Sequence, residues 1–341
     1  MNILNVVSGL QRASGVSVFV EEMARELIRR GHVVRIATSS NQLDLVEWAD
    51  VVHIHGLWTP VLHRACRVAR TLERPVVWSP HGMLQKWALR NKWPKKVLAL
   101  GLYQWWDLRA ARLLHATAQC EVEDIRRIGL KNRIVVAPLG VREPPAVKSD
   151  VPVGNAEFRT LLFVSRVQRK KGLPNLLTAW SLLPERSRSG WRIRIVGPDQ
   201  ERHTDELRTL AAQLAIEDQV IFVGPRYADD LEFEYNHADA FVLPTHSENF
   251  GSVVIEALAH GVPVICTKAA PWEELETNRC GWWVEDSLEA IRHALGEMID
   301  CVQDLRDMGE RGRRLVREKY TWYNVAQTME VGYYEAVHKD C

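Results

Sequence analysis

The stretch from residue 245 to residue 259 has residue types and a spacing that predict binding of phosphate and of sugar hydroxyls. Glu248 and Glu256 flank a short polar segment that contains glycine. The amphipathic run 253–259 predicts a helix, whose first turn presents unpaired backbone N–H groups and about half a positive charge. Such a helix start binds phosphate. Phosphate repels carboxylates, so we expect the two glutamates to accept hydrogen bonds from sugar hydroxyls.

The spacing of these glutamates resembles the Glu-x7-Glu signature of retaining nucleotide-sugar glycosyltransferases of family 4, which have the GT-B fold. The resemblance implies that Glu248 holds hydroxyls of the donor sugar and that Glu256 holds the ribose. It also implies donor contacts, including backbone N–H groups on the diphosphate, at Asn249, Phe250, Gly251 and Ser252. Taken singly, each glutamate could also be an ordinary solvated acid.

A basic loop from Arg166 to Gly172 is the second candidate cluster. It follows a predicted strand and precedes a predicted helix with Pro174 in its first turn. Cations in a dry site stabilise the negative charge that develops on a diphosphate leaving group. The resemblance assigns this role to Arg166 and Lys171, with Arg169 and Lys170 as weaker candidates; a solvated basic turn is the alternative.

Three histidines lie in or just after predicted strands of the N-terminal half. His81 follows the strand at 76–80, at the edge where open α/β sheets bind ligands, and the resemblance implies contact with the donor sugar near its reacting carbon. His53 and His55 alternate onto one face of an earlier predicted strand, 51–56. Such a pair can bind metal, but no further ligands stand at a suitable spacing, so we interpret both as structural.

Two further loops are predicted to contact the donor. The loop 8–15 lacks the G-x-G-x-x-G fingerprint, which disfavours a nicotinamide enzyme. Family 4 members carry adjacent glycines here, whereas this chain has Ser14 and Gly15, so Gly15 keeps the predicted contact. The resemblance places the nucleobase at 225–227, where Arg226 and Tyr227 are the candidate side chains.

Residues 86–106 mix basic residues with tryptophans. Such a segment can lie in a membrane interface, with aromatic rings at the headgroups and cations on anionic lipid. The predicted acceptor or membrane contacts are Lys86, Trp87, Arg90, Trp93, Lys95 and Lys96. The alternative is a pair of helices whose apolar faces are core. No apolar run reaches the ~20 residues of a membrane-spanning helix.

Elements that position these residues alternate between strand and helix, which predicts an α/β fold with parallel sheets. Prolines and glycine at 141–155 predict a linker. We therefore expect two Rossmann-like domains, an acceptor-binding domain at 1–145 and a nucleotide-sugar-binding domain at 156–320. The resemblance adds a central cleft between them and a final helix, 321–341, that crosses back onto the first domain.

Composition limits the possible partners. The chain has 341 residues and a net charge of +1, which argues against a general nucleic-acid binder. Residues 1–150 nevertheless carry 22 Lys and Arg against 13 Asp and Glu, so this half favours an anionic partner. Six cysteines without a C-x-x-C pair, and a first strand that begins without a basic leader, predict a cytoplasmic protein with reduced thiols.

Together the motifs predict a retaining transferase that moves a sugar from a UDP- or GDP-linked donor to an acceptor hydroxyl. The expected acceptor is a lipid-linked or membrane-proximal saccharide of surface polysaccharide or lipopolysaccharide synthesis, which would place the protein at the inner face of the plasma membrane. The chain has no convincing D-x-D motif, so we expect no metal and no cofactor besides the donor. The resemblance implies front-face attack with the departing phosphate as base. A GT-B nucleotide-sugar 2-epimerase and a non-catalytic binding or scaffold subunit are the alternatives.

Overall fold

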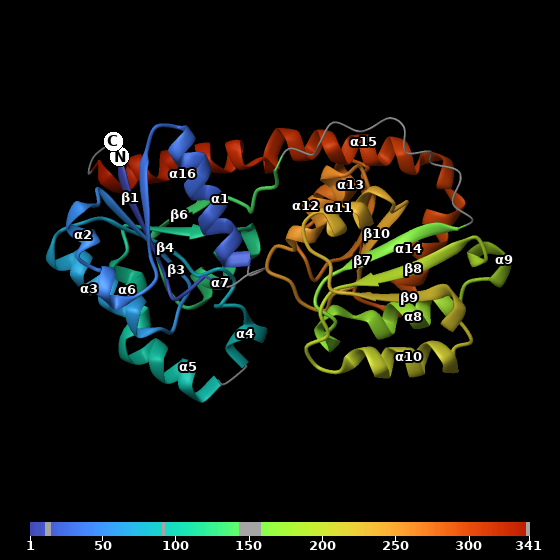
Figure 1. Ribbon diagram of the computed structural model, residues 1–341. Coiled ribbons are helices and arrows are strands. Elements are labelled where there is room, and N and C mark those ends of the chain that lie inside the picture. The colour runs from blue at the N-terminus through green and yellow to red at the C-terminus, as the bar shows by residue number, and fades with distance from the viewer. Residues whose placement is uncertain (11–14, 91–92, 143–157, 339–341) are drawn as a thin grey trace. The chain divides into compact units, whose positions relative to one another are not determined.

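The computed structural model describes residues 1–10, 15–90, 93–142 and 158–338 (Figure 1). The chain divides into two compact units, Met1–Gly140 with Tyr320–Cys341, and Val141–Lys319. The first unit thus contains both ends of the chain. Most of the predicted linker, from residue 143 onward, lies outside the described residues, as does Ser14.

The first unit is built on a parallel sheet with the strand order β2-β1-β3-β4-β5-β6. Its strands are β1 Asn2–Val7, β2 Val33–Ala37, β3 Val51–His55, β4 Val76–Ser79, β5 Leu113–Ala116 and β6 Arg133–Val136. Its helices are α1 Gly15–Arg29, α2 Leu45–Trp48, α3 Pro60–Thr71, α4 Lys86–Arg90, α5 Trp93–Ala99, α6 Trp105–Ala110, α7 Gln119–Arg127 and α16 Trp322–Val337, with a 3-10 turn at Ser40–Gln42 and a π-helical turn at Leu100–Gln104.

The two faces of this sheet follow the two-residue alternation of its strands. Leu4 and Ile54 pack with the cluster under α3, α6 and α7. Ile3 and Val51 face the other way, toward Phe19 of α1. On this second face α16 supplies Trp322, Val325, Ala326, Met329, Tyr333 and Ala336. The C-terminal helix therefore completes the core of the first unit.

The second unit has a parallel sheet with the strand order β12-β11-β10-β7-β8-β9. Its strands are β7 Arg159–Val164, β8 Trp191–Val196, β9 Val220–Gly224, β10 Ala240–Leu243, β11 Val264–Thr267 and β12 Gly281–Val284. Its helices are α8 Leu173–Ser181, α9 Glu185–Arg188, α10 His203–Gln213, α11 Asp229–Asn236, α12 Ser252–Ala259, α13 Glu274–Thr277, α14 Leu288–Asp300 and α15 Leu305–Leu315, with 3-10 turns at Arg169–Lys171, Glu217–Gln219 and Val302–Asp304 and a π-helical turn at Val316–Tyr320.

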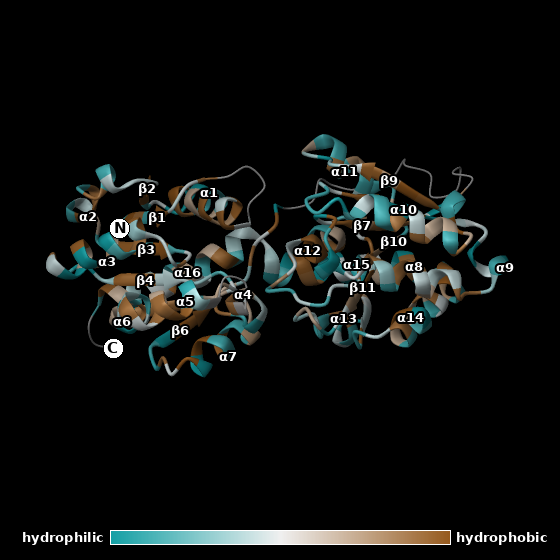
Figure 2. Ribbon diagram, turned by 90° about the horizontal axis from the view of Figure 1, so that it is seen from below, coloured by the Kyte–Doolittle hydropathy of each residue, from teal (hydrophilic) through white to brown (hydrophobic). Residues whose placement is uncertain are grey.

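Hydropathy follows this layering. The strands of both sheets are mainly brown in Figure 2, whereas surface helices such as α10 carry many teal residues. Strands buried on both faces read as continuous apolar runs, which is why the parallel sheets could be predicted. The prediction of two parallel α/β sheets is confirmed.

The strand order reverses at one point in each sheet, and this point locates a site. Ligands of open α/β sheets bind outside the carboxyl ends of the strands where the order reverses. In the second unit this point lies between β7 and β10, and in the first unit between β1 and β3. The loops that follow β7 and β10 contain the basic loop and the first of the two glutamates.

Candidate active site

In the second unit, the loops after β7 and β10 lie directly against each other. Gly172 has φ +69°, and a Cβ there would lie 1.8 Å from the carbonyl oxygen of Pro244. The backbone N–H of His246 donates to the carbonyl oxygen of Lys170 at 2.9 Å. Only glycine permits this approach, so Gly172 brings the basic loop to the loop that carries Glu248.

Lys171 and Glu248 form a largely buried ion pair between these loops. The Lys171 ammonium donates to Glu248 Oε2, and their side chains are only 6% and 15% exposed. Burial acts to raise the pKa of Glu248, but the charges of Lys171 and Lys170 and a hydrogen bond from Lys171 hold that pKa below its usual value. Glu248 is therefore a carboxylate, paired with a cation at the switch point of the sheet.

The helix α12 begins beside this pair. Gly251 precedes it with φ +81° and, having no side chain, supplies no capping hydrogen bond to the helix start. A Cβ on Gly251 would lie 3.2 Å from Cγ of Glu248. The indole of Trp272 donates to the carbonyl oxygen of Phe250 at 2.6 Å, which fixes the turn into the helix. The uncapped N–H groups and the lysine thus lie on either side of one carboxylate.

The other basic side chains of the loop separate into two groups. Lys170 is partly buried, and burial lowers its pKa against the opposing effect of Glu248. Arg169 is exposed and pairs with Glu206 on α10. Arg166 is also exposed, with Nη1 3.5 Å from Gln200 Oε1. Lys170, the weaker candidate from the sequence, thus shares the surroundings of Glu248.

Glu256 lies on the buried side of α12. Its carboxylate accepts a hydrogen bond from the hydroxyl of Tyr235 at 2.9 Å and another from the hydroxyl of Ser252. Burial raises the pKa of Glu256, and these two hydrogen bonds oppose the effect. The sequence did not predict Tyr235 as a partner of Glu256.

The remaining donor candidates lie at the ends of other elements. Arg226 follows β9, and its Nε is 3.9 Å from Oε1 of Glu234, which also binds Arg194 through two hydrogen bonds of 2.8 Å.

Gly15 is the first residue of α1 in the first unit. A Cβ there would meet no described atom within 4 Å, so packing within the described part of the chain does not require a glycine.

In the first unit, His81 occupies a fixed and strained turn after β4. Its φ is +53°, unusual for a residue with a side chain, and Gly82 follows with φ +72°. The N–H of Gly82 donates to Oε1 of the buried Glu121 at 2.5 Å. Thr117 donates to the other oxygen of Glu121 from its N–H and its hydroxyl, both at 2.8 Å. This carboxylate therefore anchors the His81 turn.

Two family models match adjoining parts of this chain. The model described as "Glycosyltransferase Family 4" matches residues 43–143, and that described as "Glycosyl transferases group 1" matches residues 149–315. A D-inositol 3-phosphate glycosyltransferase of Xylanimonas cellulosilytica is 26% identical over 97% of this chain and 94% of its own. The chain thus has the GT-B fold, and its sequence is similar to those of glycosyltransferases over most of its length.

Solved structures of GT-B glycosyltransferases share the fold over nearly the whole chain. Anabaena Alr3699/HepE in complex with UDP has a TM-score of 0.79 and 17% identity, covering 97% of this chain and 99% of its own. WaaG, described as a glycosyltransferase involved in lipopolysaccharide biosynthesis, has a TM-score of 0.68 and 16% identity. The match covers 96% of this chain and 99% of the WaaG chain. The predicted GT-B fold class is confirmed.

Several curated relatives match this GT-B chain over only part of their length. An uncharacterized glycosyltransferase of Haemophilus influenzae is 29% identical over 53% of this chain and 51% of its own. An uncharacterized glycosyltransferase of Methanocaldococcus jannaschii is 30% identical over 50% of this chain and 43% of its own. The chain thus spans about half the length of these relatives.

The two histidines that we interpreted as structural are buried in the GT-B chain and hydrogen-bonded. His53 bonds Tyr333 and Ser79, and His55 bonds Asn5 and His81. Within the residues that the structure covers, no group of His, Cys, Asp or Glu side chains is arranged to hold a metal ion.

Several partners in the first unit were missed from the sequence. Glu121, Asn5, Ser79 and His115 are buried, and all make hydrogen bonds that fix the histidines or the His81 turn. The sequence does contain a pattern from which three of these partners could have been predicted. Asn5, Ser79 and His115 interrupt apolar strands near their carboxyl ends, on the face that α1 and α16 cover.

The basic, tryptophan-rich segment forms α4, α5, a π-helical turn and α6 instead of two regular helices. Leu98, Leu102 and Trp106 are 62%, 68% and 57% exposed, at a four-residue spacing that places them on one face. Lys86 and Lys95 are exposed, Trp87 is half exposed, and Lys96 donates to the carbonyl oxygen of Ala88 at 2.6 Å. The side chains of Arg90 and Trp93 are outside the described set. None of the described helices is long and apolar enough to cross a lipid bilayer.

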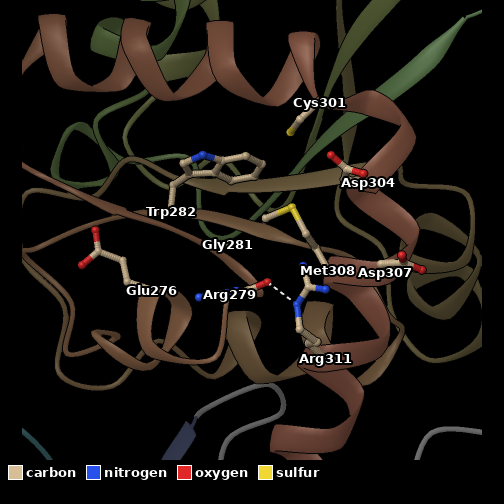
Figure 3. A pocket seen from close by; sticks show the side chains of 9 residues that line it. All are labelled: Glu276, Arg279, Gly281, Trp282, Cys301, Asp304, Asp307, Met308 and Arg311. Carbon is tan, nitrogen blue, oxygen red and sulfur yellow. Dashed lines mark hydrogen bonds between the residues drawn. The ribbon is translucent and has the colours of Figure 1, made fainter.

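A separate pocket of about 560 Å³ lies in the second unit (Figure 3). It is lined by Trp282, Arg279, Met308, Asp304 and others from α13, β12 and α15. Gly281 and Trp282 begin β12, so the pocket lies at the amino end of this edge strand. Ligands of such sheets bind at the carboxyl ends, so this pocket is not part of the candidate active site.

Proposed function

We propose that this chain is a retaining, metal-independent glycosyltransferase that moves a sugar from a nucleotide diphosphate sugar to an acceptor hydroxyl. One observation carries the proposal: the buried Lys171–Glu248 pair beside the uncapped start of α12, at the switch point of the second sheet. A cation, helix N–H groups and a carboxylate are the groups that a phosphorylated sugar requires.

Each group has a distinct task in this proposal. The first turn of α12 and the ammonium groups of Lys170 and Lys171 bind the diphosphate, and they stabilise the charge that develops when it departs. Glu248 accepts hydrogen bonds from sugar hydroxyls. Because Glu248 already pairs with Lys171 in the free protein, the lysine side chain is in place before the donor arrives. The departing phosphate serves as the base for the attacking hydroxyl, so the site requires no additional carboxylate.

The proposed donor is a uridine or guanosine diphosphate sugar, and a neighbour in fold supports the uridine form. The HepE structure is described in complexes with UDP, with UDP and glucose, and with UDP-glucose. The test is incubation of the purified protein with UDP-glucose, UDP-galactose and GDP-mannose, with and without a membrane lipid extract as acceptor source. We expect one donor to release its nucleoside diphosphate faster with the extract, and equally well in EDTA.

This assay separates the proposal from its alternatives. A 2-epimerase would release nucleotide without an acceptor and would invert the substituent at C2 of the sugar. A scaffold subunit would release none, and Lys171→Met would leave its cellular role unchanged. Loss of activity in EDTA would contradict metal independence, and an anomer opposite to that of the donor would contradict retention.

We also propose that the exposed face of α5 and α6 contacts an anionic membrane that holds the acceptor. The apolar face of Leu98, Leu102 and Trp106, together with the exposed lysines nearby, supports this contact. Leu98→Glu with Leu102→Glu should abolish sedimentation with vesicles containing phosphatidylglycerol. Leu182→Glu, at an exposed leucine of the second unit, is the matched control. Unchanged sedimentation of the double variant would contradict the contact.

A further inference from the structure

A layer of buried polar side chains crosses the first sheet near the carboxyl ends of its strands. Asn5, His53, His55, Ser79 and His115 come from β1, β3, β4 and β5, and none is more than 1% exposed. Buried polar groups are costly unless they are hydrogen-bonded. The hydrogen bonds of this layer form two separate hydrogen-bonded chains of side chains. One of them ends on a backbone carbonyl group and the other ends on His81.

The first chain ends on backbone and has a single consistent proton arrangement. The carbonyl oxygen of Ala137 can only accept, so His115 Nε2 donates to it at 2.7 Å. His115 Nδ1 then accepts from the Ser79 hydroxyl at 2.6 Å. Ser79 Oγ in turn accepts from His53 Nε2 at 2.6 Å, and His53 Nδ1 accepts from the Tyr333 hydroxyl at 2.7 Å. Every member is neutral and satisfied, so this chain is structural.

The second chain ends on His81. In the orientation that the structure gives the Asn5 amide, its Oδ1 accepts from His55 Nε2 at 2.9 Å, and its buried Nδ2 has no hydrogen-bond partner among the described residues. With its proton on Nε2, a neutral His55 has only a lone pair at Nδ1, and this atom lies 3.1 Å from His81 Nε2. With the Asn5 amide in this orientation, His81 Nε2 carries the proton and donates it to His55 Nδ1. The other ring nitrogen of His81 is an acceptor, and it has no hydrogen-bond partner among the described residues.

The surroundings of His81 hold it in this state. Its backbone is fixed by the turn that Glu121 anchors, and the Phe19 ring packs edge-on at a centroid distance of 5.4 Å. Burial, together with His115, lowers the pKa of His81 to about 3, and burial lowers the pKa of His55 well below its usual value. Both rings are thus neutral at physiological pH, so each has one donor and one acceptor nitrogen.

We propose that His55, oriented by Asn5, is a positioning residue that holds His81 in the Nε2–H tautomer and presents its Nδ1 as an acceptor to a substrate hydroxyl. That such a hydroxyl belongs to a sugar substrate rests on the proposed function. The positioning does not, because it is a property of the free protein.

The first test measures the tautomer directly. Protein labelled with ¹⁵N-histidine gives distinct shifts for protonated and unprotonated ring nitrogens, and His81→Gln assigns the His81 signals. We expect Nε2 protonated and Nδ1 unprotonated from pH 5.5 to 8, and a mixture of tautomers in His55→Leu. A His81 ring that carries its proton on Nδ1, or that titrates near pH 6.5, would overturn the proposal. So would an unchanged tautomer in His55→Leu.

The second test measures catalysis with matched variants. An Asn at position 55 places an amide oxygen near the position of Nδ1, whereas a Gln places its amide near that of Nε2. For nucleotide release from the accepted donor, we expect His55→Gln to lower kcat by about tenfold to a hundredfold with little change in KM. We expect His55→Asn to retain most of the wild-type kcat. Tyr333→Phe removes a hydrogen bond from the structural chain only, and is the control for core damage.

A double variant completes the test. If His55 acts through His81, adding His55→Gln to His81→Ala causes no further loss, whereas independent effects would multiply. Multiplying effects, or a loss in Tyr333→Phe equal to that in His55→Gln, would overturn the positioning role. If the wild-type protein turns over no donor, the proposed function fails, and the tautomer measurement still decides the positioning.

Discussion

Lys171 and Glu248 are buried together, and each compensates the charge of the other. Burying either alone would cost several kcal/mol, because a charge loses its hydration in the protein interior. The pair places a cation and a carboxylate at the point of the sheet where a ligand is expected to bind. Lys170 adds a second cation, while Arg169 turns outward to Glu206.

Substituting Lys171 by methionine should expose this dependence. Without the ammonium group, less opposes the effect of burial, so the pKa of Glu248 should rise from its present depressed value. The free energy of unfolding should fall by about 3 kcal/mol, measured by urea denaturation. Arg169→Met on the same loop removes only an exposed pair and should change it by less than about 1 kcal/mol. Equal effects of the two substitutions would contradict the account.

At this scale the sequence predicted residue types better than partners. Glu248 was predicted because its spacing from Glu256 matches a known signature, and Lys171 because it lies with Arg166 in a basic loop between a strand and a helix. Arg166 was ranked above Lys170, but which side chain of a basic loop turns inward depends on a local 3-10 turn at 169–171. Tyr235, the partner of Glu256, lies on a different helix, and no local pattern relates the two.

Elements bring the site residues together through close backbone contacts. The loop after β7 reaches the loop after β10 because Gly172 has a positive φ and no side chain. The strand and helix alternation was predictable from apolar runs and breaks. The π-helical turns at 100–104 and 316–320 were not, since an inserted turn leaves no distinct periodicity over so few residues.

Alanine at position 172 should therefore separate the two loops. Its Cβ would overlap the Pro244 carbonyl oxygen, so the basic loop must move. We expect a lower melting temperature and loss of donor-dependent stabilisation, both measured by thermal unfolding with and without UDP. Gly190→Ala is the control, because a Cβ there meets no described atom within 4 Å. A Gly172→Ala protein that responds to UDP as wild type does would refute the importance of this contact.

The whole chain returns to its first unit through α16. Tyr333 and Met329 pack on the sheet, and Glu330 binds His32 at 2.7 Å and Arg30 through hydrogen bonds of 3.0 and 2.5 Å. The resemblance implied a final helix that returns to the first domain, and Trp322, Val325, Met329 and Tyr333 have the helical spacing that such packing, or ordinary core packing, requires. The polar layer that Tyr333 joins could not be predicted, because it depends on which strands are neighbours.

That polar layer makes the stability of the first unit depend on pH. Burial lowers the pKa of His53 and His55 well below 6.5, that of His81 to about 3 and that of His115 to about 4. The unfolded chain binds these protons at higher pH than the folded chain, so stability is full above pH 6.5 and falls as the pH falls below it.

Urea denaturation between pH 7.5 and 5 measures this loss. Each histidine that stays neutral in the folded state contributes a slope of about 1.4 kcal/mol per pH unit once the unfolded chain is protonated. His115→Phe removes one such group and should reduce the slope by about that amount. A free energy of unfolding that is constant down to pH 5 would contradict the neutral, buried state of these rings.

The central claim is that the second unit binds the diphosphate of a nucleotide donor through Lys171 and the start of α12. Calorimetric titration with UDP, GDP, UMP and GMP tests it most directly, with wild type, Lys171→Met and the control Arg169→Met. The account predicts that one diphosphate binds at least about tenfold more tightly than its monophosphate, that Lys171→Met removes this difference, and that Arg169→Met keeps it. Equal binding of mono- and diphosphates by the wild type, or an unchanged preference in Lys171→Met, would contradict it.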